Sequence, residues 1–118
     1  MYREVGKMVE EKNISQKDVK TTKVMNLLHM ARKAGKLKLG FDACERSMFT
    51  GVSKLTIVAA DVSEKTRQRL DDLTEDINIK KVEFGTKELF GSEFNIRNVA
   101  IISIEDKNFA KGLIKLFD

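Results

Sequence analysis

Residues 31–66 have the sequence ARKAGKLKLGFDACERSMFTGVSKLTIVAADVSEKT, in which helix and strand signals alternate. Residues 36–39 alternate polar and apolar side chains, the pattern of a half-buried strand. Gly40 then begins a helix with helical spacing of its apolar positions, and Gly51 ends it. The run LTIVAA at residues 55–60 is a largely apolar run rich in branched residues, as in a central strand buried on both faces. The stretch therefore predicts a strand, a helix and a second strand in succession.

The rest of the chain continues this alternation. We expect further helices at residues 21–35, 63–76 and 108–117, strands at 81–84 and 99–104, and a single helical turn at 87–90 followed by a polar loop at 91–98. Helices that alternate with short apolar strands imply a sheet with parallel pairs and helices on both faces. The predicted fold class is therefore α/β, a three-layer α/β/α sandwich with a small mixed sheet.

Length and composition favour a single domain preceded by a short extension. The 118 residues fit one hydrophobic core, and no apolar run approaches the ~20 residues that span a bilayer. Residues 1–19 carry only a weak helical face, so we expect either a short helix or a disordered arm there, with the domain at residues 20–118. Cys44 is the only cysteine and the N-terminus lacks the pattern of a secretory signal, which favours the cytoplasm.

The positive charge of the chain is concentrated in one segment. Residues 20–54 carry eight basic and two acidic side chains, whereas residues 1–19 are balanced and residues 55–118 carry ten basic and twelve acidic ones. A local excess of this kind favours a partner with a phosphate backbone, and RNA is the partner that we expect. A merely solvated helix face is the alternative, and charge alone does not separate the two.

The sequence offers no coherent catalytic or metal site. The motifs GxxxxGK[ST] and GxGxxG are absent, and one cysteine with one histidine cannot supply a typical zinc site. Cys44 near a helix start is a conceivable nucleophile with His29 as its base, but its spacing predicts a buried, apolar position. Asp61 ends a buried strand, the position at which α/β enzymes place functional groups. Alternatively, Asp61 caps the helix that begins at Ser63. We therefore expect no enzyme and no cofactor.

The start of the helix at Gly40 is the candidate site that requires the fewest assumptions. A glycine allows another backbone to approach closely, and the first N–H groups of a helix, here those of Phe41, Asp42 and Ala43, have no intrahelical acceptor. Such a helix start attracts anions, and three basic residues flank it in the sequence: Lys36, Lys38 and Arg46. Asp42 would accept a hydrogen bond from a base amine or a 2′-hydroxyl, or it simply stabilises the helix N-terminus.

The stretch at residues 31–66 resembles the signature region of the kink-turn-binding ribosomal proteins, the L-seven-Ae and L-thirty-e family. The likeness is greatest to the small bacterial YlxQ-type members, and it extends over about residues 24–117. It includes the GTKELFG turn, the VAIISI strand and the terminal DKNFAKGLIKLF helix. The resemblance implies a compact α/β/α sandwich that binds structured RNA in a ribosomal or ribosome-associated setting.

The resemblance also implies which residues meet the RNA. In the family, the glycine that opens the second helix and the residues after it enter the widened groove at the sheared G·A pairs; here these are Gly40, Phe41, Asp42 and Arg46. The loop before the last strand closes over an expelled nucleotide, to which Phe94 or Ile96 would supply the apolar contact. Three further residues are expected at the interface: Asp61, Asn95 and Arg97.

Two departures from the family pattern predict altered affinity. Members that bind RNA best have an Asn-Glu pair where this chain has Asp42 and Ala43, and a second Glu where it has Ala60. Each lost recognition contact is worth about 1–3 kcal/mol, so binding is expected to be weaker or differently specific. The alternative function is a protein-interaction module in ribosome assembly or translation, docking through its N-terminal arm and an exposed apolar loop around Phe94.

Overall fold

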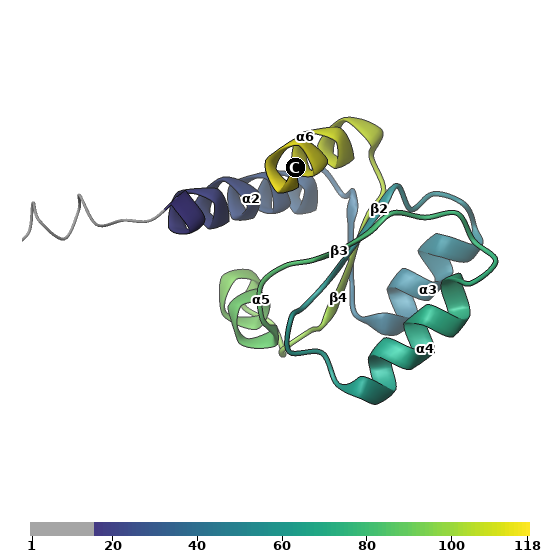
Figure 1. The fold of residues 1–118 in the computed structure, drawn as a ribbon. Coiled ribbons are helices and arrows are strands. Elements are labelled where there is room, and N and C mark those ends of the chain that lie inside the picture. Colours follow the sequence, from purple (N-terminus) through teal and green to yellow (C-terminus); the bar gives the residue numbers. More distant parts are fainter. Residues whose placement is uncertain (1–15) are drawn as a thin grey trace, which may run out of the picture.

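The computed structural model describes residues 16–118 and shows five helices and four strands in this part of the chain (Figure 1). Of the extension expected at residues 1–19, residues 1–15 lie outside the described part of the chain. Residues 16–19 belong to the helix that begins at Gln16. The elements in chain order are α2 (Gln16–Lys33), β1 (Leu37–Leu39), α3 (Phe41–Phe49), β2 (Leu55–Val58), α4 (Glu64–Thr74), β3 (Lys81–Glu83), α5 (Lys87–Phe94), β4 (Ile101–Ile104) and α6 (Lys107–Phe117).

The four strands form one mixed sheet in the order β1-β4-β2-β3. β4 is antiparallel to both of its neighbours, and β2 is parallel to β3. α3 and α4 cover one face of the sheet, while α2, α5 and α6 lie on the other side (Figure 1). The predicted three-layer α/β/α sandwich with a small mixed sheet is therefore confirmed. None of the helices in residues 16–118 combines the length and the apolar character needed to cross a membrane.

The continuous apolar runs are explained by two separate cores, one on each face of the sheet. Successive side chains of a strand point to opposite faces. In β2, Ile57 packs in the core under α2 and α6, and its neighbour Val58 packs in the core under α3 and α4. In β4, Ile102 and Ile101 divide in the same way. Every residue of both strands is buried, so neither strand shows a polar face.

The expectation for residues 87–98 is wrong in part, because α5 continues to Phe94 instead of ending after one turn. Phe90 and Phe94 lie one turn apart and are both buried, which places an apolar stripe on this helix. Gly91 is also buried, and a side chain there would collide with Asn98. Asn95 ends the helix in the left-handed conformation, with φ 55°. The predicted loop thus begins only at residue 95.

Candidate nucleic-acid interface

Most of the predicted site lies at one end of the sheet, which we call the Gly40 end. The N–H of Gly40 donates to the carbonyl of Ile101 (2.9 Å), and the N–H of Ala59 donates to that of Ala100 (2.8 Å). Strands β1, β2 and β3 run in the same direction and all finish here, while β4 begins here. The β1–α3 turn, the start of α4 and the loop before β4 therefore lie at the lower edge of the sheet in Figure 1.

The N-terminus of α3 is open. Gly40 has φ 94° and ψ 158°, supplies no side-chain cap, and accepts only the N–H of Cys44 (3.0 Å) with its carbonyl. The N–H groups of Phe41, Asp42 and Ala43 have no acceptor within residues 16–118. These three donors, together with the positive end of the helix dipole, form the anion-attracting helix start that was expected.

Arg69 in α4 holds the first turn of α3 from the side. Its guanidinium carbon lies 4.0 Å from the centre of the Phe41 ring, a cation–π distance. Its Nη2 lies 3.9 Å from the Asp42 carboxylate and 3.8 Å from that of Glu45. The sequence analysis missed Arg69, and no local signal identifies it, because the contact depends on how α3 packs beside α4.

Asp61 is a positioning residue at this end of the sheet. Its Oδ1 accepts the backbone N–H of Lys87 (2.9 Å), which ties the β2–α4 connection to the start of α5. The alternative role of Asp61 as the cap of α4 is wrong, because Ser63 provides that cap by accepting the N–H of Thr66 (3.2 Å). The carboxylate of Asp61 is thus already engaged in ordering the surface next to Gly40.

The loop after α5 differs from expectation in its aromatic residue. Phe94 is only 3% exposed; its ring lies 5.1 Å from the His29 ring, and its carbonyl accepts a hydrogen bond from Arg32 (2.7 Å). Phe94 therefore presents no surface to a nucleotide, and no exposed apolar loop surrounds it for protein docking. The remaining predicted loop residues are accessible: Asn95 and Arg97 are exposed and Ile96 is half-buried.

Lys36 and Lys38 are not brought to the Gly40 end, contrary to expectation. Lys36 precedes β1 and accepts the N–H of Glu105 (2.8 Å) with its carbonyl, so about 13 Å of extended strand separates it from Gly40. The ammonium of Lys38 lies 4.0 Å from the carboxylate of Glu105 at that far end. Arg46 is exposed on the last turn of α3, about 7.5 Å along the axis from the helix start.

Cys44 has the environment of a core residue. It is fully buried on the side of α3 that faces the sheet, and its thiol donates weakly to the carbonyl of Lys38 (3.4 Å). Burial raises the pKa of this thiol to about 12. His29 lies across the sheet, where its Nε2 is 2.9 Å from a carboxylate oxygen of Glu93. Among residues 16–118, no three His, Cys, Asp or Glu side chains are grouped as metal ligands.

The raised pKa of Cys44 predicts a pH-dependent stability. The unfolded thiol ionises near pH 9.0 and the folded one near 12, so stability present below pH 9 is lost as the pH rises through this window. At pH 10 the expected loss in the free energy of unfolding is about 1.4 kcal/mol. Urea unfolding at pH 8 and pH 10 measures it, with Cys44→Ala as the reference. If Cys44→Ala loses as much stability as the wild-type protein between pH 8 and pH 10, another titrating group is responsible.

Comparison with known proteins agrees with this architecture. The sequence model of the family described as ribosomal protein L7Ae/L30e/S12e/Gadd45 matches residues 22–114. Large ribosomal subunit protein eL8 of Thermoplasma volcanium is 33% identical over 94 residues, 79% of this chain and 78% of that protein.

Two solved structures share the fold. A protein with unknown function from Bacillus halodurans C superposes with a TM-score of 0.74 at 24% identity, over 81% of this chain and 97% of that one. A 15.5 kD RNA binding protein of Giardia lamblia superposes with a TM-score of 0.67 at 20% identity, over 82% and 83% of the two chains. With the family match extending over most of its length, this chain belongs to the ribosomal protein L7Ae/L30e/S12e/Gadd45 family.

Proposed function

We propose that this protein binds structured RNA, of kink-turn or ribosomal type, without catalysing a reaction, in a ribosomal or ribosome-associated complex of the cytoplasm. The observation that carries the proposal is the open N-terminus of α3 at Gly40, in a chain that belongs to this family. A curated relative is a protein of the large ribosomal subunit, and a solved structure with the same fold is described as RNA binding. Both descriptions support a role in RNA recognition.

The first turn of α3 would make the central contacts. The free N–H groups after Gly40 donate to phosphate oxygens or to acceptors on base edges. Asp42 accepts from a base amine or a 2′-hydroxyl, and Arg69 beside it offsets the negative charge that would otherwise repel a phosphate. Phe41, held under Arg69, places a flat apolar surface against the RNA groove.

The remaining residues surround this turn. Asn95 and Arg97 lie in the accessible loop that leads into β4, and they would supply hydrogen bonds and charge to the second strand of the RNA. Of the two residues expected to supply the apolar contact, Phe94 or Ile96, the half-buried Ile96 would make it. Arg46 contacts phosphates at the outer edge, and Asp61 positions the surface through Lys87.

An Arg69→Ala variant tests this arrangement. We expect about tenfold weaker binding to kink-turn RNA, because the first turn of α3 loses its lateral support and a neutralising charge. Fluorescence anisotropy would measure binding to a kink-turn and to the same RNA with its G·A pairs replaced by Watson–Crick pairs. The wild-type protein should prefer the kink-turn.

Arg67→Ala is the matched control. It removes the same charge from the same helix, but Arg67 pairs with Glu83 (2.9 Å) and not with α3. Its effect should stay within about threefold, the range of a screened surface charge. Equal affinity of the wild-type protein for the two RNAs would refute the proposed function. Equal losses in the two arginine variants would refute the role of Arg69.

A further inference from the structure

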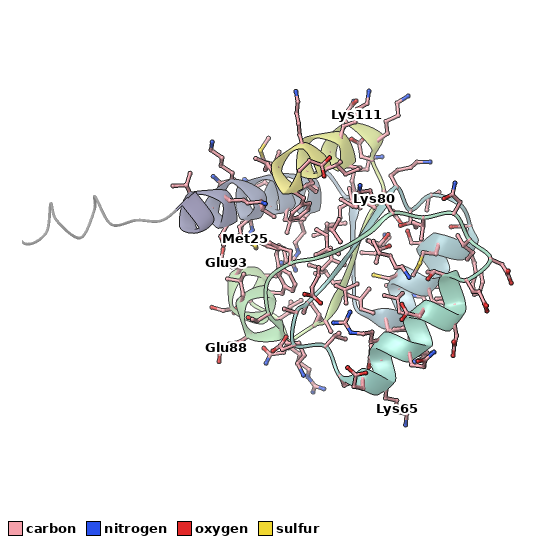
Figure 2. All side chains as sticks on the ribbon, viewed as in Figure 1. Met25, Lys65, Lys80, Glu88, Glu93 and Lys111 are labelled. Carbon is pink, nitrogen blue, oxygen red and sulfur yellow. The ribbon has the colours of Figure 1, made fainter. Side chains whose placement is uncertain are left out.

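The end of the sheet opposite Gly40 carries a row of lysines, which we call the lysine end: Lys36, Lys54, Lys80 and Lys107. The first three immediately precede β1, β2 and β3, which all start at this end, and Lys107 begins α6 soon after β4 finishes there. Since neighbouring strands lie about 4.8 Å apart, the backbone positions of the three strand-leading lysines follow one line about 15 Å long across the end of the sheet. Figure 2 shows Lys80 and Lys111 at this upper end of the molecule and Lys65 at the lower end.

These lysines are exposed and almost unpaired. Within residues 16–118, the side chains of Lys36, Lys80 and Lys107 have no ion pair or hydrogen bond, and the Lys54 ammonium has only a 3.5 Å contact with a carbonyl. Two carboxylates pair with basic residues at this edge: Glu105 lies 4.0 Å from Lys38, and Asp71 lies 3.2 Å from Lys81, the residue after Lys80. Neither pair includes a lysine of the row, so within the described residues these four ammonium groups have no carboxylate within 4.0 Å.

An exposed aromatic ring accompanies the row. Phe49, the last residue of α3, is 65% exposed, more than any other large apolar residue of the described chain. It lies at the opposite end of α3 from Gly40, and the turn that follows it leads directly to Lys54. Burying Phe49 in the nearby core would have been favourable, since a phenylalanine contributes about 1.5–3 kcal/mol when buried. Its exposure, one short turn along the chain from Lys54, points to a ligand with both a flat apolar face and negative charge.

We propose that the lysine end and Phe49 bind a single-stranded segment of RNA, with phosphates on the lysines and one unpaired base stacked on the Phe49 ring. Single strands are favoured over duplexes because only an unpaired base offers its face to an aromatic side chain. A nucleic acid is favoured over an acidic peptide because the lysines follow a line, as the charges of a phosphate backbone do, and because the ring requires a planar partner. The inference shares the RNA class of the proposed function but uses none of its contacts.

The two surfaces lie at opposite ends of the same sheet, so one protein would hold two RNA segments. The kink-turn would occupy the Gly40 end, and a single strand would cross the starts of β1, β2 and β3. The length of α3, nine residues or about 13 Å, sets the separation between Gly40 and Phe49.

Anisotropy titrations of the full chain with a short labelled polyuridylate test the inference. Phe49→Ala should bind about tenfold more weakly, the loss of one base stack. The double variant Lys54→Gln/Lys80→Gln should lower the slope of log affinity against log salt by about 1.4, since each single-strand phosphate contact contributes about 0.7. The controls Val52→Ala and Lys65→Gln, one apolar on the same turn and one at the lower end of the molecule, should leave binding unchanged.

The same titrations separate this inference from the proposed function. Kink-turn binding should survive Phe49→Ala, and polyuridylate binding should survive Arg69→Ala. Loss of kink-turn preference with intact polyuridylate binding would overturn only the proposed function. Unchanged polyuridylate binding by Phe49→Ala and by the double lysine variant would overturn the inference. Tighter binding of polyglutamate than of polyuridylate, lost in Phe49→Ala, would also overturn it and assign the surface to an acidic protein.

Discussion

Replacing Gly40 with alanine should weaken binding to kink-turn RNA roughly 10- to 100-fold, the equivalent of about 1.4–2.7 kcal/mol. At φ 94° and ψ 158°, Gly40 adopts a conformation that residues with a Cβ almost never do. Apart from its chain neighbours, nothing lies within 4 Å of the position of an added Cβ, so the effect arises from the backbone and not from a collision. An alanine would rotate the start of α3 and redirect the free N–H groups of its first turn. Anisotropy with kink-turn RNA measures the loss.

Gly51→Ala controls for general destabilisation. Gly51 follows α3 at its other end, has φ 77°, and also has no atom within 4 Å of an added Cβ. Both variants should lose about 1–3 kcal/mol of stability, which for a domain of this size lowers Tm by roughly 4–8 °C per kcal/mol. Only Gly40→Ala should lose affinity for kink-turn RNA at a temperature where both proteins are folded. A comparable loss of affinity in Gly51→Ala would mean that backbone strain at either end of α3 weakens kink-turn binding, and that the effect is not specific to Gly40.

The strands and most helix boundaries were predictable because the signals that determine them are local. The runs at residues 55–60 and 99–104 are apolar except for Thr56 and Ser103, because β2 and β4 supply both cores, and the structure places strands in both. Ser63 marks the start of α4 through its own side chain. The candidate helix start at Gly40 is similarly local, since a glycine with no side-chain cap leaves the first N–H groups free.

The parts of the site that were missed depend on tertiary structure. The basic segment at residues 20–54 suggested one surface, but β1 carries the chain from Lys36 at one end of the sheet to Gly40 at the other. Its charge is therefore divided between two surfaces. The sequences of α2 and α6 together contain eight basic residues and one acidic residue. Those of α3 and α4 together contain four basic residues and five acidic residues. Arg69 reaches Phe41 only because two helices distant in sequence pack side by side.

Phe94→Ala should lower the free energy of unfolding by about 3–5 kcal/mol, the usual cost of removing a buried phenylalanine side chain. Phe94 packs in the core cluster that also contains Leu28 and Phe90, and it joins α5 to α2 through its contacts with His29 and Arg32. A loss of this size lowers Tm by well over 10 °C in a domain of about 100 residues. Thermal unfolding followed by circular dichroism measures it.

Phe94→Leu separates a core role from the nucleotide contact that the sequence suggested. Leucine keeps a smaller apolar side chain in the core, so the cost in stability should be clearly below that of Phe94→Ala, and RNA affinity should not change. A stacking contact with a nucleotide would instead be lost with the ring while stability stayed nearly intact. Ile96→Ala, two residues further along and half-buried, is expected to show the reverse pattern of reduced RNA affinity with little change in Tm. If Phe94→Leu weakens RNA binding and Ile96→Ala does not, then α5 must open on binding to expose Phe94, and the free protein does not show the bound shape of this loop.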